Sequence, residues 1–268
     1  MGRRSSGSST LIDPWIWASG GAILGAILGS FLATIVIRWP RGGTVRRGRS
    51  ACDSCNKPLA PRDLVPIFSF LWTRGLCRYC AAPIPRVHII MEGMAALIGA
   101  AAVTAAPNWI GITGAVFGWM LLLLAALDLR HYWLPDRVTG AMAVLGLVVG
   151  VLGTLPFLAE PQVHPDLWGR VFGALAGFLG LAAVALIYRS VRKREGLGGG
   201  DPKMLGAIGA WVGLYAVVQV LLGATIIGLS FVLIKAINRE RIKFDDKLPL
   251  GALMALAAFP VWLWMQSS

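Results

Sequence analysis

The sequence predicts an all-α fold, a polytopic membrane helical bundle of about eight transmembrane helices. Hydrophobic residues make up 56% of the 268 residues, charged residues only 14%, and the mean hydropathy is +0.69. This balance leaves too little polar surface to keep a globular domain of this size in solution. Several apolar stretches approach the roughly 20 residues that a helix needs to cross a bilayer. None of them alternates with the period of two of a membrane barrel, so helices are expected to satisfy the backbone in lipid.

The apolar stretches, taken in order, give the expected spans. The first, 15–37, follows two arginines as a signal peptide does, but it is longer than a usual signal core and ends without a small-residue cleavage site. We therefore expect an uncleaved helix. The stretch 204–237 must cross twice if Lys203 and Arg239 lie on one side, and each crossing is then short, tilted or partly re-entrant. The remaining expected spans are 89–105, 110–127, 138–158, 167–188 and 250–265.

The basic residues set the expected orientation of these spans. They lie in loops, and the positive-inside rule places such loops in the cytoplasm. The other connections contain no Lys or Arg, so we expect them on the opposite side together with both termini, although Arg3 and Arg4 favour the reverse. The net charge of +12 then reflects topology, and no nucleic-acid partner is expected. The basic loops are 38–86, 130–137, 189–203 and 235–247.

The four cysteines of the sequence form two C-x-x-C pairs in the longest basic loop. Cys52 and Cys55 make the first pair, and Cys77 and Cys80 follow about twenty residues later, the spacing of tetrathiolate zinc sites. Four thiolates close a tetrahedral structural site with no open position. Disulfides are disfavoured in a cytoplasmic loop, while redox-active or iron-binding cysteines are the alternatives. The pattern predicts a small zinc-bound cytoplasmic loop domain, for which the metal supplies much of the folding free energy.

Two aspartates stand next to expected spans. Asp128 follows the apolar run 121–127, and Asp201 follows three glycines at the start of another span, so both lie at cytoplasmic helix ends. Ionisable residues at such positions are costly and are functional candidates. Two close aspartates share a proton, so that the ionised one activates water and the protonated one donates to a carbonyl. The pair therefore indicates hydrolysis of an amide bond.

The glycines before Asp201 have two interpretations. Gly198 and Gly200 allow the backbone to approach a partner helix or a bound extended peptide closely. The same triple glycine is also typical of a flexible C-cap of the preceding helix. A phosphate-binding Walker loop is excluded because Gly-Lys-Ser/Thr is absent.

These motifs resemble those of the type IV prepilin peptidases, membrane aspartyl proteases of the GxGD type, over most of the chain. The segment 198–205, followed by Gly-Ala-Trp-Val-Gly at 209–213, is similar to the family's GxGD motif. Asp128 with Leu-Pro-Asp at 134–136 is similar to its other aspartate motif, and Leu-Pro-Leu-Gly at 248–251 resembles the motif before the last helix. The paired cysteines and Gly-Ser-Phe-Leu at 29–32 are also typical, whereas Ala33 replaces the family's asparagine.

The resemblance implies a multi-pass enzyme of the bacterial inner membrane with its active site at the cytoplasmic face. Asp128 and Asp201 would be the catalytic pair, cleaving the basic leader of type IV prepilins or pseudopilins after a glycine. Members with the cysteine loop often then methylate the new N-terminus with S-adenosylmethionine. Type IV pili and type II secretion are the expected settings.

Three charged residues complete the expected site beside Gly198 and Gly200. Asp136 is a supporting carboxylate or, more simply, the cap of the next helix. Lys203 holds the charge of Asp201 or anchors the span at its inner end. Glu92 is a snorkelling residue or a functional one, and the resemblance favours function because the family has a glutamate there.

Three parts of the chain are expected to have separate roles. Residues 1–40 form the N-terminal transmembrane helix, 41–88 the cysteine loop, and 89–268 the multi-helix membrane peptidase domain. A proton-coupled transporter is the main rival function, and it predicts that aspartate-to-asparagine changes abolish flux without any peptide product. A zinc-organised scaffold or a methyltransferase without protease activity predicts that those changes leave its function intact.

Overall fold

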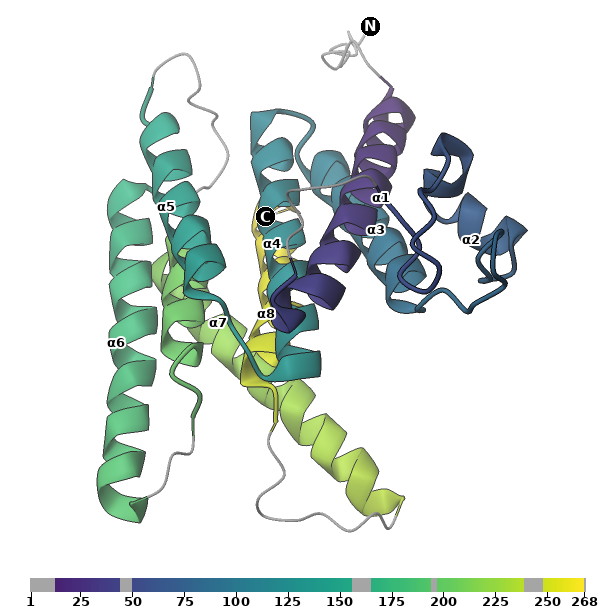
Figure 1. The fold of residues 1–268 in the computed structure, drawn as a ribbon. Helices are drawn as coiled ribbons and strands as arrows, with labels where there is room; N and C mark the ends of the chain where they lie inside the picture. The colour runs from purple at the N-terminus through teal and green to yellow at the C-terminus, as the bar shows by residue number, and fades with distance from the viewer. Residues whose placement is uncertain (1–12, 44–49, 156–164, 194–196, 239–247, 268) are drawn as a thin grey trace, which may run out of the picture.

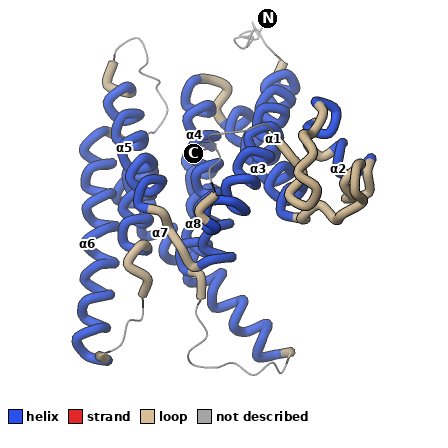
Figure 2. Tube along the Cα trace, viewed as in Figure 1, coloured by secondary structure: helices blue, strands red, loops and turns tan. Residues whose placement is uncertain are grey.

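The structure is a computed structural model that describes residues 13–43, 50–155, 165–193, 197–238 and 248–267. Within these residues it contains helices and no strand, apart from the isolated bridges Ala51–Pro58 and Leu76–Pro83 (Figure 2). The expected all-α fold is confirmed. The helices are α1 (Pro14–Arg38), α2 (Phe68–Trp72), α3 (Val87–Ala105), α4 (Trp109–His131), α5 (Asp136–Leu152), α6 (Leu167–Arg192), α7 (Asp201–Ile237) and α8 (Leu250–Ser267), with 3-10 turns η1 (Trp39–Arg41) and η2 (Pro61–Leu64).

The bundle has two sides joined through a central layer (Figure 1). Helix α1 packs mainly on α3 at one side, and helices α5 and α6 pack on α7 at the other. Helices α4 and α8 lie between α3 and α7. Within the part of the chain that the structure describes, six helices are long and apolar enough to span a membrane, namely α1, α3, α4, α6, α7 and α8. Helix α5 has only 17 residues and ends at Leu152, so the expected span 138–158 is too long. Gly153 and Thr154 turn the chain there with short-range backbone hydrogen bonds to Val149 and Val151.

Helix α7 contains the double passage that the sequence predicts for 204–237. At Gly213 the backbone has φ 78° and ψ 177°, a conformation open only to glycine, and an added Cβ would lie 2.6 Å from Pro165 Cβ. Before this break Gly209 packs on Gly173, so the first part runs antiparallel to α6. After it, Gly223 faces Ala257 and Gly228 faces Leu253, so the second part runs antiparallel to α8.

The first part of α7 is too short to cross a bilayer. Residues 201–212 make a helix of about 18 Å at 1.5 Å per residue, against roughly 30 Å of hydrocarbon. The N-termini of α7 and α8 lie at the same end of the bundle, because Leu134 contacts both Gly200 and Gly251. The chain therefore turns back at Gly213, as the sequence predicts, and Asp201 begins the short part.

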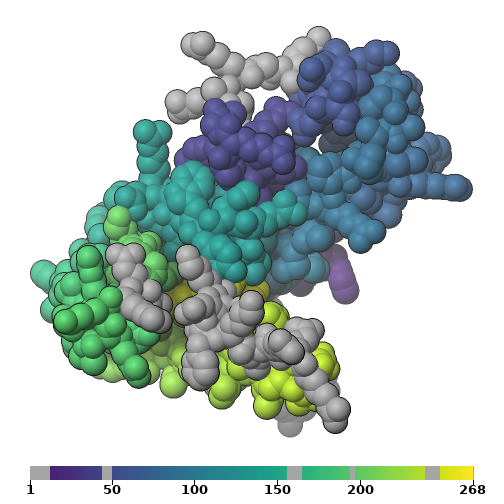
Figure 3. Space-filling view, turned by 60° about the horizontal axis from the view of Figure 1, so that its bottom comes forward, coloured from purple at the N-terminus to yellow at the C-terminus, as the bar shows by residue number. Residues whose placement is uncertain are grey.

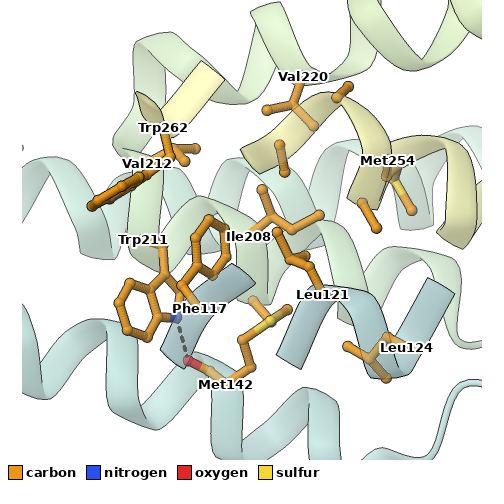
Figure 4. Close-up of a cluster of buried hydrophobic side chains, with 14 of the residues drawn as sticks. Phe117, Leu121, Leu124, Met142, Ile208, Trp211, Val212, Val220, Met254 and Trp262 are labelled. Carbon is orange, nitrogen blue, oxygen red and sulfur yellow. Dashed lines mark hydrogen bonds between the residues drawn. The ribbon is translucent and has the colours of Figure 1, made fainter. Parts of the chain in front are cut away.

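The core of the bundle packs around one aromatic pair (Figure 4). The rings of Phe117 on α4 and Trp211 on α7 stack with centroids 4.8 Å apart, and Trp211 Nε1 donates to the carbonyl oxygen of Met142 on α5 at 2.7 Å. Indole rings are large apolar surfaces whose N–H needs a partner when buried, and a helix carbonyl supplies it here. This contact ties the short part of α7 to α4 and α5.

Arg170 is a buried cation beside the break in α7. Its Nε donates to the carbonyl oxygen of Pro165 at 3.1 Å, and its Nη1 donates to those of Gly146 and Ala210, each at 3.2 Å. Ala210 lies in the last turn before Gly213, where a broken helix leaves carbonyls without their usual N–H partners. A cation at a helix C-terminus is also favoured by the helix dipole. Arg170 thus stabilises the end of the short part of α7.

Replacing Arg170 by methionine is expected to lower stability by about 2–3 kcal/mol, because three carbonyl oxygens lose the guanidinium that donates to them. The apparent melting temperature in detergent should fall by several degrees, as followed by intrinsic fluorescence. The melting temperature of Arg170→Lys, which keeps the charge and one donor nitrogen, should lie between those of wild type and Arg170→Met. Equal melting temperatures for all three proteins would contradict this role.

Candidate active site and metal centre

Asp128 lies in the last turn of α4, where the chain leaves the bundle. Its side chain is buried, with 5% of the residue exposed. Its Oδ2 accepts a hydrogen bond from the backbone N–H of Ala252 at 2.8 Å, in the first turn of α8. Free N–H groups at a helix N-terminus form a natural site for a carboxylate. The first turn of α8 therefore fixes where the Asp128 carboxylate lies.

Asp201 is the first residue of α7 and is also buried, with 7% of the residue exposed. Its Oδ2 accepts from the backbone N–H of Gly198 at 2.9 Å, and its own N–H donates to the carbonyl oxygen of Gly198 at 3.1 Å. The interpretation of the triple glycine as a C-cap is wrong, because α6 ends earlier, at Arg192. The glycines form instead the turn that presents Asp201.

Three chain segments that are far apart in the sequence meet at these two carboxylates. Leu134 contacts the positions that a Cβ would occupy at Gly200, at 2.8 Å, and at Gly251, at 2.9 Å. The backbone N–H of Gly251 faces both carboxylates, and Asp128 and Asp201 are close enough to interact electrostatically. A side chain at Gly200 or Gly251 would push these segments apart. The two aspartates thus form one pair at one end of the bundle.

Asp136 and Lys203 form an ion pair at the rim of this site. Lys203 Nζ lies 2.7 Å from Asp136 Oδ1, and both side chains are largely exposed. The expectation that Asp136 caps α5 is wrong, because Pro135 takes the cap position and the Asp136 carboxylate accepts no cap hydrogen bond. Among the described residues Lys203 makes no ion pair with Asp201, so it does not hold that charge directly. The pair joins the first turns of α5 and α7.

The four cysteines come together in the loop that connects α1 to α3. One sulfur from each of Cys52, Cys55, Cys77 and Cys80 lies within 4.8 Å of all the others. The two C-x-x-C pairs, or knuckles, share one backbone pattern, in which the fourth residue after the first cysteine donates back to that cysteine's carbonyl oxygen. The residues that donate are Asn56 to Cys52 and Ala81 to Cys77, each with a φ of 55°.

The sulfur arrangement fits a tetrahedral metal. Sulfurs about 2.3 Å from a zinc ion lie about 3.8 Å apart at tetrahedral angles, and Cys52 Sγ and Cys80 Sγ lie 3.9 Å apart. The four cysteines can therefore bind a metal ion.

Glu92 lies on the wall of a separate cavity. It is 6% exposed, and its Oε2 accepts from the backbone N–H of Ile67 at 2.7 Å. It therefore does not snorkel to the surface. The cavity has a volume of about 230 Å³ and lies between the C-terminal half of α1, the cysteine loop and the first turns of α3. Other lining residues include Thr34, Asp63, Phe70, Tyr79 and His88, and neither Asp128 nor Asp201 is among them.

The two sites lie at the same end of the bundle. Trp39, just after α1, and Trp133, in the loop after Asp128, contact edge to face with centroids 5.3 Å apart. Figure 3 brings this end forward and shows the cysteine loop, in blue, projecting beside the purple end of α1 and next to the teal segments around α4 and α5. The Trp39–Trp133 contact joins the segment that follows α1 to the segment that follows Asp128.

Sequence reasoning missed the groups that position the aspartates. The contacts of Leu134 and of the Ala252 N–H are invisible to motif spacing, since each acts across the tertiary structure. One signal was available. Leu-Pro-Leu-Gly at 248–251 places a proline and a small residue where a helix begins, which exposes N–H groups to a neighbouring anion.

Comparison with known proteins agrees with this architecture. Residues 23–106 match the bacterial peptidase A24 N-terminal domain, and residues 115–233 match the type IV leader peptidase family. A prepilin leader peptidase/N-methyltransferase of Aeromonas hydrophila is 34% identical over 220 residues, which are 82% of this chain and 72% of the relative. The protein of that name from Klebsiella pneumoniae is 34% identical over 219 residues, 79% of this chain and 92% of the relative. The Aeromonas salmonicida protein of that name is 29% identical over 280 residues, 95% of this chain and 93% of the relative.

No solved structure matches the chain significantly. The two family models lie one after the other along the chain, and the second includes both Asp128 and Asp201. The relatives cover most of the chain at identities that establish common descent. This chain belongs to the type IV leader peptidase family.

Proposed function

We propose that this chain is a membrane aspartyl endopeptidase, which cleaves the basic leader of type IV prepilins or pseudopilins after a glycine and then methylates the new N-terminus. The pairing of Asp128 and Asp201 at one end of a helical bundle carries the proposal. Its location is the bacterial inner membrane, with the site at the cytoplasmic face, because the described basic residues in 38–43, 50–86 and 130–137 lie at that end.

The aspartates would act as one acid–base unit. The two carboxylates share a proton, so the ionised one takes a proton from the attacking water while the protonated one donates to the carbonyl oxygen of the scissile bond. Collapse of the tetrahedral intermediate breaks the C–N bond, and the leaving amine takes a proton from the pair. A backbone hydrogen bond holds Oδ2 of Asp128 at Ala252 and Oδ2 of Asp201 at Gly198. The other oxygen of each carboxylate, Oδ1, is then the one available to substrate.

The substrate would enter as extended backbone. Gly199 has open space around the position of an added Cβ, so the turn before Asp201 leaves room there, while Leu134 packs against the neighbouring Gly200. The net charge of +12 does not attract a basic leader as a whole, so local groups must bind it. The pair of Asp136 and Lys203 is exposed in the first turns of α5 and α7, and its carboxylate would be one such group.

The four cysteines would bind zinc in a structural role. The sulfur spacing suits a closed site of four thiolates, which leaves no coordination position for catalysis. Zinc would then stabilise residues 41–88 as a loop domain, between the N-terminal helix at 1–40 and the peptidase domain at 89–268. The loop has few buried side chains besides Cys77, which is why the metal is needed.

Methylation would take place at the cavity under the cysteine loop. S-adenosylmethionine supplies an electrophilic methyl group on a sulfonium cation, and a neutral amine accepts that methyl and loses a proton. The cavity offers the carboxylates of Glu92 and Asp63 and the rings of Phe70 and Tyr79, which suit a cationic ligand with an aromatic base. Its location at the same end of the bundle as the aspartates suits a substrate that is first cut and then methylated.

Replacing Glu92 by glutamine is expected to reduce methyl transfer at least about tenfold while leaving cleavage within about threefold. The amide oxygen can still accept from the Ile67 N–H, so the loop contact is kept and only the negative charge is lost. Transfer of labelled methyl groups to an already cleaved substrate measures the first effect, and peptide cleavage measures the second. Unchanged methyl transfer in this variant would exclude Glu92 from the donor site.

The proposed function is tested with purified protein in detergent and a prepilin-like substrate, with products identified by mass spectrometry. One cut after the glycine, followed by a gain of one methyl on the new N-terminus when the methyl donor is added, supports both steps. A substrate with the glycine replaced by a bulky residue is the matched control. Proton-coupled solute flux by the reconstituted protein without any peptide product supports the transporter instead.

A further inference from the structure

The segment between the two cysteine knuckles exposes an apolar surface. It comprises η2, α2 and their flanks, residues 61–76, which we call the α2 segment. Phe68 is 73% exposed and Trp72 is 85% exposed, unusual values for large apolar side chains outside a membrane span. The other exposed apolar residues of the segment are Leu64, Val65, Leu71 and Leu76.

The depth of the α2 segment is set by its contact with α3. The Ile67 N–H donates to Glu92, which lies five residues after Val87, so the contact is about 7.5 Å along the helix from its start. Ile67 has φ 65° and ψ −54°, and Phe68 N–H donates to the carbonyl oxygen of Pro66. This tight turn is strained for a β-branched residue, so the Glu92 contact helps to hold it. Figure 1 shows α2 beside α3.

The contact places the apolar side chains level with the second turn of a membrane helix. Because α3 is one of the helices apolar enough to span, its first turns lie where headgroups meet acyl chains. Phe68, Leu71 and Trp72 follow the contact directly and are exposed at that level. Trp is the side chain that membrane proteins favour at this depth.

The charge of the α2 segment also favours a membrane surface as its partner. Arg62 and Arg74 are exposed at the two ends of the α2 segment, while its acid, Asp63, is paired with Arg78 at 3.0 Å. The exposed charge of the segment is therefore basic, which suits anionic headgroups. A basic prepilin leader would be repelled here, which argues against the substrate as the occupant of this surface.

We propose that the α2 segment docks on the bilayer, with Phe68, Leu71 and Trp72 inserted at the interface and Arg62 and Arg74 on anionic headgroups. The cysteine loop is then fixed to the membrane at a third point besides α1 and α3. Such anchoring holds the cavity wall that includes Leu64, Phe70 and Leu76 in a constant position relative to the bilayer. The proposal depends on the membrane location of the chain and not on either catalytic activity.

The test measures the depth of Trp72 in the full-length protein. The chain is placed singly in nanodiscs of phosphatidylcholine and phosphatidylglycerol, with or without phosphatidylcholine brominated near the top of its acyl chains. The fluorescence of Trp72 is obtained by subtracting the emission of the Trp72→Phe variant from that of wild type. We expect brominated lipid to quench this component at least about twofold more strongly than a tryptophan at a solvent-facing site of the same loop. Lys57→Trp in the Trp72→Phe background supplies that control, because Lys57 is exposed in the first knuckle.

Each outcome decides the proposal. Quenching of Trp72 no stronger than that of position 57, with ready quenching by acrylamide, overturns it and leaves the surface in water. Protection from both quenchers also overturns it, because a protein surface then covers Trp72. The Arg62→Gln, Arg74→Gln double variant should lose about half of the lipid quenching in discs with phosphatidylglycerol. Unchanged quenching in that variant overturns the headgroup contacts.

Discussion

Replacing either Asp128 or Asp201 by asparagine is expected to lower the rate of leader cleavage by at least about 10³-fold. An amide can neither take a proton from water nor give one to the carbonyl oxygen, so the loss of one member disables the pair. Asparagine keeps the shape of each side chain, and its oxygen can still accept from Ala252 or Gly198. Cleavage is followed by mass spectrometry on single-turnover samples.

The matched control for this pair is Asp136→Asn. Asp136 is a carboxylate at the rim of the same site, but it is exposed and bound to Lys203, so its loss should cost less than about tenfold. Metal content and melting temperature should be the same in all three variants. Cleavage that persists in Asp128→Asn or Asp201→Asn at near the wild-type rate would remove the two aspartates from the mechanism.

Replacing Cys77 by serine is expected to remove most of the bound metal and unfold the cysteine loop. Cys77 is buried and contributes one of the clustered sulfurs, and a structural zinc site supplies roughly 10 kcal/mol or more to the fold that it closes. The metal content measured by elemental analysis should fall from one ion per chain to a small fraction of that. The loop 50–86 should become sensitive to protease, and methyl transfer should fall at least about tenfold because the cavity wall is lost.

Ser54→Ala, in the first knuckle but without a metal-binding sulfur, is the control for the cysteine variant. It should retain the metal and the protease resistance of wild type. Leader cleavage by Cys77→Ser should stay within about fivefold of wild type, because the aspartates lie on α4 and α7 outside the loop. Full metal content in Cys77→Ser would show that the four sulfurs do not act as one site.

Much of the fold follows from local sequence. The apolar runs predicted α1, α3, α4, α6 and α8 to within a few residues, because a helix in lipid must be apolar for most of its length and stop at charged loops. The basic residues predicted the double passage of 204–237, which the break at Gly213 makes. Helix α5 was predicted too long, since it ends just before Gly153 and glycine is also frequent inside membrane helices.

The site shows where local sequence stops being informative. The spacing of the cysteines predicted their cluster, because two knuckles of fixed geometry can hardly avoid sharing an ion. The role of Asp136 was predicted wrongly, since a cap and an ion pair with Lys203 are equally compatible with a carboxylate at a helix start. The sequence motifs contained Leu134, Gly200 and Gly251, but their meeting at the aspartate pair was beyond prediction, because it occurs only after α4, α7 and α8 have packed.

The sequence by itself determined that the chain is a bundle of membrane helices with a metal-binding loop and two aspartates at helix ends. Each of these depends on composition or on spacing over a few residues, where backbone geometry leaves few options. Only the tertiary structure decided that the N-terminus of α8 holds Asp128, that Arg170 stabilises the broken helix, and that Glu92 positions the α2 segment. These contacts join residues far apart in the chain, so they depend on how whole helices pack and not on the sequence next to either partner.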